Sequence, residues 1–345
     1  MKTKLLFGII TAAAFTLQQG KTQDIHFSQF WMAPLIQNPA YTGAVYDMQG
    51  IINYKSQWGC IAEPYKTYDA SFDMAFSKTK KKKGWMAAGI NFFSDKAGDS
   101  QMGTLQGNLN FAYHLRLDAV NTLGAGMMGG FVQRSINYSA LQWGNQYDGS
   151  SYVSGSPSGE PVGAASRTFI DGGAGIVWTY SQGEEYMTAN NRIKINAGAS
   201  VFHPHQPDYS FYKSGERLYM KWVAHANFLY GIKNTNISIV PSLMYYRQGP
   251  TQEILSGILF RAIIKESAKY TGFISGSAFS AGIHYRADDA AVVSVFLEKG
   301  LYALGVSYDL NTSDLRTASD YRGGIEISLR YAAPGPFATK SSYKY

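Results

Sequence analysis

The stretch SVFHPHQPDYSFY holds the side chains in this sequence that are best suited to chemistry. His203 and His205 flank Pro204, and Asp208 follows three residues after the second histidine. Imidazole and carboxylate groups at such spacing can form half of a metal site. A third and a fourth ligand are not evident in the sequence, and Pro204 and Pro207 are typical of a loop at the end of a strand. We therefore predict no metal site and no cofactor.

Asp69 and Asp73 form a second candidate site, in which one carboxyl group would act as acid and the other as base. Four residues of extended strand separate two side chains by roughly 13 Å, at about 3.3 Å per residue, which is too far for them to cooperate. Asn108, Asn110 and His114 alternate in the same way on another segment, which indicates a hydrated surface. No serine–histidine–acid set, phosphate loop or metalloprotease motif appears, so we predict that the protein is not an enzyme.

Alternating polarity predicts the elements that carry these polar residues. From Tyr65 to Phe76 one face is apolar and aromatic while the other carries Asp69 and Asp73, and residues 104–115 repeat the pattern. Strands of a membrane barrel alternate in this manner, with one face toward lipid and the other toward the lumen. The same test finds about fourteen strands, an even number as such barrels require. They are residues 45–56, 65–77, 84–93, 102–116, 120–134, 169–181, 191–203, 218–230, 236–247, 251–264, 272–286, 289–298, 301–310 and 322–332.

Composition and connections agree with an all-β fold, a transmembrane antiparallel β-barrel over residues 44–332 in contact with outer-membrane lipid. Only 16% of residues are charged, against roughly 25% in a typical soluble domain. No apolar run beyond the first residues is long enough for a transmembrane helix. The predicted connections at 137–168, 204–217 and 311–321 are long and fall at one end of the barrel, where outer-membrane barrels have their external loops.

Charge and cysteine content exclude several classes of protein. The formal net charge is +7, but the basic residues are not gathered on one face, so we expect no nucleic-acid partner. The single cysteine, Cys60, excludes an internal disulfide framework. One dense basic run, formed by Lys78, Lys80, Lys81, Lys82 and Lys83, falls on an inner turn. It is either a solvated turn or an electrostatic contact for a periplasmic partner.

The first residues have the pattern of a secretory signal peptide. Lys2 and Lys4 precede an apolar run from Leu5 to Leu17 that is too short to span a bilayer. We expect a cleaved signal peptide at residues 1–22, with the exact cleavage site left open. At the other end, residues 333–345 show no sign of structure, and we expect a flexible periplasmic tail.

Residues 23–43 lack the pattern of a strand. Pro34 and Pro39 have no N–H for a ladder, and the Asn38-Pro39 step favours a turn. Glycine-rich stretches at residues 124–130 and 172–175 would let another segment approach the wall closely. We therefore expect residues 23–43 to fold into the lumen as a plug. The residues expected to be buried there include His26, Phe27, Gln29, Phe30, Trp31, Asn38 and Pro39.

Three stretches of the sequence form a set of motifs that extends over essentially the whole mature chain. The first comprises Asp24, His26, Phe27, Ser28, Gln29 and Phe30, followed by Asn38, Pro39 and Ala40. The second comprises His203, Gln206, Pro207 and Phe211. The third is the last predicted strand, with Gly323, Gly324, Glu326, Ile327, Ser328, Leu329 and Tyr331. Together these stretches resemble the PorP/SprF family of type IX secretion outer-membrane proteins, in which a proline is common at the position of Ile25.

This resemblance implies an accessory component of type IX secretion that works with surface-directed or gliding adhesins. Its expected partners are the C-terminal signal domain of a secreted protein or adhesin, and periplasmic components of the same system. The external loops would form the docking face. They carry aromatic residues, in which the binding energy of protein interfaces concentrates. The residues we expect to contact a partner are His203, His205, Gln206, Pro207, Tyr209, Phe211, Tyr212, Tyr147 and Tyr152. The alternatives are a passive porin or hydrophobe transporter with an open lumen, and loop aromatics that only pack on one another.

Overall fold

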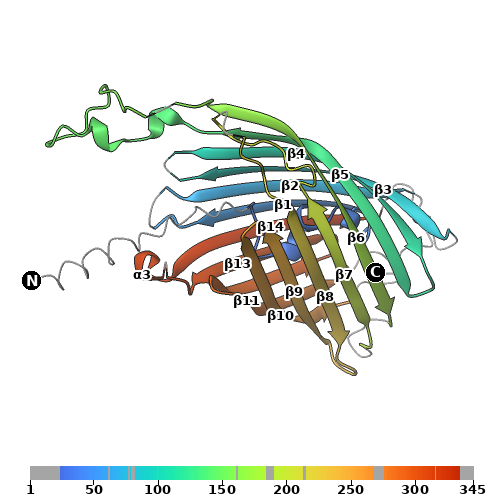
Figure 1. The fold of residues 1–345 in the computed structure, drawn as a ribbon. Coiled ribbons are helices and arrows are strands. Elements are labelled where there is room, and N and C mark those ends of the chain that lie inside the picture. The colour runs from blue at the N-terminus through green and yellow to red at the C-terminus, as the bar shows by residue number, and fades with distance from the viewer. Residues whose placement is uncertain are drawn as a thin grey trace, which may run out of the picture.

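The computed structural model shows a closed antiparallel β-barrel (Figure 1). It describes residues 24–334 except 61–62, 77, 79–81, 99, 161, 184–189, 213–214, 267–275 and 315. The predicted signal peptide and all but the first two residues of the predicted tail therefore lie outside the described residues. No helix in the described part of the chain is long and apolar enough to cross a membrane.

The described residues form fourteen strands, as the alternation of polarity predicts. Their bounds are β1 (Met48–Gln57), β2 (Tyr65–Phe76), β3 (Gly84–Ala97), β4 (Met102–Arg116), β5 (Asn121–Ser135), β6 (Ser166–Gln182), β7 (Ile193–Phe202), β8 (Lys221–Gly231), β9 (Ile237–Gln248), β10 (Thr251–Lys265), β11 (Ser277–Arg286), β12 (Ala290–Lys299), β13 (Tyr302–Asn311) and β14 (Arg322–Ala333). Short helices occupy η1 (Phe30–Met32), α2 (Pro34–Gln37), η2 (Pro39–Tyr41), η3 (Tyr138–Ala140), η4 (Gly144–Gln146) and α3 (Arg316–Ser319).

Each strand pairs with its neighbour in sequence, and the first strand closes on the last. In β1, Met48 faces Ala333 and Gln57 faces Gly324 across the closing seam with β14. Because no strand is left at an edge, every ladder is paired within the chain, as a lipid-embedded sheet requires.

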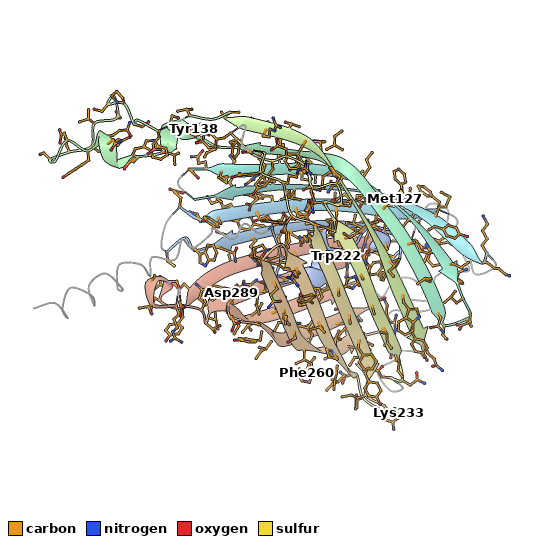
Figure 2. All side chains as sticks on the ribbon, viewed as in Figure 1. Met127, Tyr138, Trp222, Lys233, Phe260 and Asp289 are labelled. Atoms are coloured by element: carbon orange, nitrogen blue, oxygen red, sulfur yellow. The ribbon has the colours of Figure 1, made fainter. Side chains whose placement is uncertain are left out.

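The outer face of the wall is apolar. Along β2 the exposed positions alternate with buried ones, and the buried set includes Asp69 and Asp73 as the sequence predicts. Figure 2 shows Met127, Trp222 and Phe260 on the outside of the barrel, and these side chains are 64%, 56% and 52% exposed. Such an outward band of large apolar side chains is the surface that contacts lipid in an outer-membrane barrel.

The two longest connections project from the same end of the barrel. Residues 136–165, between β5 and β6, and residues 203–220, between β7 and β8, both lie there together with α3 (Figure 1). At the opposite end β12 joins β13 through Gly300 and Leu301 alone. We call these the long-loop end and the short-turn end. Short turns face the periplasm in single-chain outer-membrane barrels, so the long-loop end faces outward.

Candidate functional site

Residues 24–43, which we call the plug, run inside the barrel from the long-loop end to the short-turn end. The plug has no strand. The short helices η1, α2 and η2 make up half of its residues, and Asn38 accepts the Ala40 N–H at 2.9 Å at the start of η2. Side chains from all fourteen strands contact the plug. The lumen is therefore filled by a segment that is attached around the whole wall.

Aromatic and aliphatic side chains of the plug fill the middle of the lumen. Phe30 is 1% exposed and packs in a cluster of inward-facing side chains: Met128, Phe202, Val223, Met244, Tyr246 and Leu255. Met32 packs with Leu259 and Phe296, and Trp31 packs against both clusters. These contacts explain why strands that face a lumen nevertheless carry apolar residues on both faces in places.

Asp24 is held at the long-loop end by a chain of charged groups. Its carboxylate lies 2.7 Å from Nε2 of His203, whose Nδ1 lies 2.8 Å from Asp171 on β6. The ammonium of Lys221 is 3.5 Å from Asp24, and the Gln248 side chain donates to it at 3.1 Å. We call this group the Asp24 latch.

The latch favours the charged form of His203. Burial disfavours the imidazolium, but the two carboxylates outweigh burial and raise the pKa of His203 to about 9. Burial likewise raises the pKa of Asp24, whereas His203 and Lys221 lower it by more, so that its pKa lies well below the ordinary range. At neutral pH both Asp24 and His203 are therefore charged, and they attract each other.

A second ionic cluster holds the plug deeper in the lumen. Glu326 on β14 accepts the backbone N–H groups of Ser28 and Gln29 at 2.7 and 2.9 Å, and it pairs with Lys55 on β1 at 2.8 Å. Asp309 on β13 accepts the Ser28 hydroxyl at 2.8 Å. The side chains of Lys55 and Glu326 are 2% and 1% exposed, so each depends on the other for compensation of its charge.

The middle of the plug lies directly on the glycine-rich wall. The Asn38 amide donates to the backbone carbonyls of Ile176 on β6 and Ala199 on β7, at 2.8 and 3.2 Å. A Cβ atom at Gly126 would lie 2.5 Å from the Ala40 nitrogen, and one at Gly175 would overlap Asn38. Two of the glycines thus allow the close approach that the sequence predicts. Gly129 has nothing within 4 Å of an added Cβ, so it does not serve this purpose.

The inner end of the plug is fixed at Gly43. Its N–H donates to Asp73 at 2.7 Å, and its carbonyl accepts from Trp85 at 3.1 Å and Lys78 at 3.4 Å. Gly43 has φ +62°, a left-handed conformation that favours glycine. Asp73 therefore anchors the plug, whereas the sequence suggested only a hydrated lumen for it.

The residues expected to bind a partner lie in three different environments. His203 is buried, with both ring nitrogens paired inside the protein, and Pro207 is also buried, so neither presents a surface to a partner. Tyr209 and Phe211 lie under the Arg134 guanidinium, at 4.7 and 5.7 Å from the ring centroids. His205, Gln206, Tyr147, Tyr152 and Tyr212 are exposed at the long-loop end.

The two longest connections also contact each other. The Ala164 N–H donates to the Phe211 carbonyl at 2.9 Å. The second connection also contacts the start of β6, where Asp208 pairs with Arg167 at 3.1 Å and Nε2 of His205 lies 2.8 Å from the Ile170 carbonyl. We call the surface formed by residues 136–165 and 203–220 the outer rim. In the described residues no group of three or more metal-ligating side chains is found there or elsewhere.

The basic run at the inner turn also separates into different environments. Lys78 is part of the anchor at Gly43 and lies 3.8 Å from Asp47. Lys82 and Lys83 are exposed, whereas Lys80 and Lys81 lie outside the described residues.

Four residues that hold the plug cannot be identified from the sequence alone. Asp309, Arg286 and Lys55 contact the plug directly, and Asp171 holds His203 against it. Each of them occupies an inward-facing position in the polarity alternation of its strand, and this is the signal that the sequence offers. The alternation does not show which strands face each other across the lumen.

Fold and site define a class: a β-barrel of the outer membrane whose lumen is filled by its own N-terminal segment. Residues 19–331 match the model of the family described as "Type IX secretion system membrane protein PorP/SprF". The chain belongs to this family, and it is an outer-membrane component of type IX secretion. Family and fold suggest a non-enzymatic role in secretion or transport.

The sequence and structure of the chain have only low similarity to proteins outside this family. No curated protein matched its sequence. Among solved structures, the Ralstonia pickettii toluene transporter TbuX has 11% identity and a TM-score of 0.45, covering 87% of this chain and 93% of its own. A deltaS2 mutant of the monoaromatic hydrocarbon channel TodX has 12% identity and a TM-score of 0.46, with the same coverage. BamA from Haemophilus ducreyi lacking POTRA domains 1–3 has 8% identity and a TM-score of 0.43, covering 84% of this chain and 70% of its own.

Proposed function

We propose that this barrel binds the C-terminal signal domain of a secreted surface protein or adhesin at its outer rim, and helps to deliver or anchor it at the cell surface. The observation that carries this proposal is the plug, which contacts all fourteen strands. A filled lumen is poorly suited to the passive diffusion of solutes, so we assign the function to the surface of the outer rim.

The outer rim has features of a protein-binding surface. Tyr147, Tyr152 and Tyr212 are 57%, 38% and 47% exposed, and Val162 is 70% exposed on the same connection as the first two. Exposed tyrosines combine a large apolar area with a hydrogen-bonding hydroxyl, and such residues dominate interface energies. The connection of residues 136–165 extends well beyond the barrel wall (Figure 1), where a partner outside the membrane can reach it.

Affinity purification from outer membranes tests the proposal. The tagged protein would be isolated from gently solubilised membranes and its bound chains identified by mass spectrometry. We expect a large secreted protein, recovered through its C-terminal domain, and we expect the Tyr147→Ser/Tyr152→Ser double variant to recover at least tenfold less. Tyr302→Ser is the matched control, because Tyr302 is 57% exposed at the short-turn end of β13.

A different outcome would favour another class of protein. A preparation that carries no partner and conducts ions in a planar bilayer would contradict the proposal and support a passive porin or hydrophobe transporter. Equal recovery with the rim variant and with the control would place the partner's contact elsewhere on the barrel.

A further inference from the structure

Two lysines face each other on the outer surface of the wall near the long-loop end. Lys66 on β2 and Lys96 on β3 are direct partners in the antiparallel ladder. Both side chains are exposed and lie on the outward faces of their strands, as Tyr68 and Phe92 do. Residues directly opposite each other in an antiparallel pair have Cβ atoms about 4.5–5.5 Å apart. The two ammonium groups can therefore reach one shared ligand.

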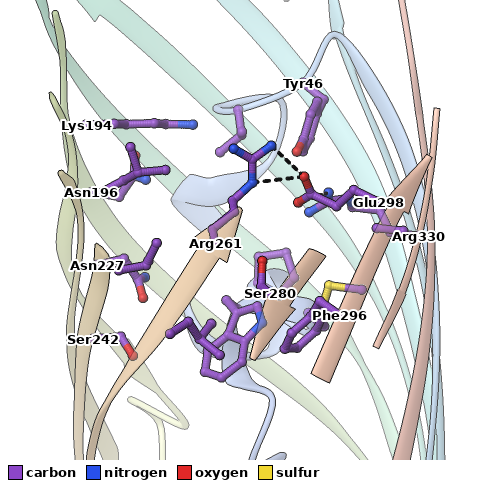
Figure 3. Close-up of a pocket in the computed structure, with 18 of the residues that line it drawn as sticks. Tyr46, Lys194, Asn196, Asn227, Ser242, Arg261, Ser280, Phe296, Glu298 and Arg330 are labelled. Carbon is purple, nitrogen blue, oxygen red and sulfur yellow. Dashed lines mark hydrogen bonds and ion pairs between the residues drawn. The ribbon is translucent and has the colours of Figure 1, made fainter. Parts of the chain in front are cut away.

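Neither lysine forms an ion pair among the described residues. Asp95, the neighbour of Lys96 in the sequence, lies on the opposite face of the strand and accepts the Thr67 hydroxyl at 2.7 Å. By contrast, Arg261 faces the lumen and pairs with Glu298 at 2.7 Å (Figure 3). Like charges directly opposite each other destabilise a sheet. The lysine pair therefore favours a negatively charged ligand from outside the barrel wall.

The height of the pair on the wall matches the outer boundary of the membrane. Phe76 lies on the same face at the short-turn end of β2, ten positions after Lys66. Ten residues at about 3.3 Å each, in a strand tilted by about 40°, rise about 25 Å along the barrel axis, which is the height of the apolar band. Tyr68 and its partner Tyr54, with ring centroids 5.1 Å apart, lie just below the lysines as an aromatic girdle does. The lysines therefore lie at the level of the lipid headgroups of the outer leaflet.

The positions beside the lysines carry small or hydroxyl side chains. Ser56 on β1 lies directly opposite Lys66, and Gly103 on β4 lies directly opposite Lys96. Gly103 in turn faces Ser135 on β5, whose hydroxyl would lie 2.8 Å from a Cβ atom at that glycine. Hydroxyl and ammonium groups donate hydrogen bonds to phosphate oxygens, and lysine commonly binds phosphate as a point charge. This row of the wall therefore suits a phosphate group.

Below this row the outward face is apolar. Phe72, Ile90 and Phe92 are 42%, 55% and 46% exposed there. A free anion would use only the polar row, whereas a lipid with a phosphate headgroup would use the polar row and the apolar face together. We propose that the lysine pair binds a phosphate of lipopolysaccharide in the outer leaflet, with the acyl chains along the apolar face below. This inference is independent of the partner proposed for the outer rim.

Native mass spectrometry of the full-length protein in detergent micelles tests the site. The probes are bisphosphorylated lipid A, the membrane anchor of lipopolysaccharide, and the same lipid A without its phosphates. We expect the bisphosphorylated form to bind at least tenfold more tightly, and Lys66→Gln/Lys96→Gln to weaken its binding at least tenfold. Lys265→Gln/Lys299→Gln is the matched control. It removes the same charge from exposed lysines at the short-turn end and should leave the binding unchanged.

A charge-reversal variant protects the test against a loss of folding. Lys96→Glu places opposite charges across the ladder, and such pairs stabilise a sheet. We expect Lys96→Glu to raise the urea midpoint of unfolding in liposomes of zwitterionic phospholipid and to weaken the binding of lipid A at least tenfold. Misfolding would not produce this combination.

Three results would overturn the proposal. The first is equal binding of the two forms of lipid A, and the second is unchanged binding or a lower urea midpoint in Lys96→Glu. The third is displacement of lipid A by inorganic phosphate at the same concentration, which would reduce the pair to a simple anion site. None of these results bears on partner recovery through the outer rim.

Discussion

Substitution of Glu326 tests most directly what holds the plug in the lumen. Glu326→Gln preserves the size of the side chain but removes the negative charge that accepts the Ser28 and Gln29 N–H groups and lies 2.8 Å from Lys55. The Lys55 side chain is 2% exposed, and its next carboxylate, Asp309, is 4.0 Å away. Breaking one side of a buried ion pair costs about 3–5 kcal/mol. A loss of about 4 kcal/mol shifts the equilibrium toward a displaced plug by about a thousandfold.

Planar-bilayer conductance and chymotrypsin cleavage at plug aromatics such as Phe30 measure this displacement. We expect Glu326→Gln to conduct and to be cleaved faster than the unmodified protein. The Lys55→Met/Glu326→Leu double variant is the control, since it leaves no buried charge unpaired and should recover part of the closed state. If Glu326→Gln stays closed and resistant while the double variant opens, then the ion pair does not hold the plug and the reasoning is wrong.

Three further predictions concern the wall, the latch and the lipid face. Gly126→Val should displace the plug and raise conductance, because its Cβ would lie 2.5 Å from the Ala40 nitrogen, whereas Gly129→Val, with nothing within 4 Å, should not. The pKa of His203 is raised to about 9, so the latch is at full strength below about pH 6.5 and weakens as the pH rises through 9. The conductance should therefore rise over that pH interval, and the conductance of His203→Gln should not depend on pH there. Phe111→Arg, on the outer face of β4, should lower the unfolding free energy in liposomes by about 2–4 kcal/mol, and an unchanged urea midpoint would contradict its contact with lipid.

The strands were predictable because the lipid and the lumen impose opposite polarities on successive residues. For β2 the predicted range of 65–77 begins at the observed first residue and includes all of Tyr65–Phe76, while residue 77 lies outside the described residues. A larger difference occurs at the end of β3, which was predicted at residues 84–93. β3 continues to Ala97, although Ser94, Asp95 and Lys96 have the polarity of a loop, because Thr67 donates to Asp95 across the ladder at 2.7 Å. Polarity alone does not report such cross-strand pairs.

The plug was predictable as a non-strand segment, but its attachments were not. Pro34 and Pro39 exclude a ladder, whereas the bond between Ser28 and Asp309 joins residues separated by 281 positions in the sequence. His203 shows the same limit. Its position in a proline-rich loop suggested a partner-binding role, and only the fold brings it between Asp24 and Asp171.

Photo-crosslinking in living cells tests most directly whether the outer rim binds a secreted partner. A benzoylphenylalanine would be placed at Tyr147 in one strain and at Tyr302 in another, and the adducts would be identified by mass spectrometry. The account predicts an adduct between position 147 and the C-terminal domain of a secreted protein, and no such adduct from position 302. Absence of protein adducts at position 147, with the barrel present and folded in the outer membrane, would contradict it.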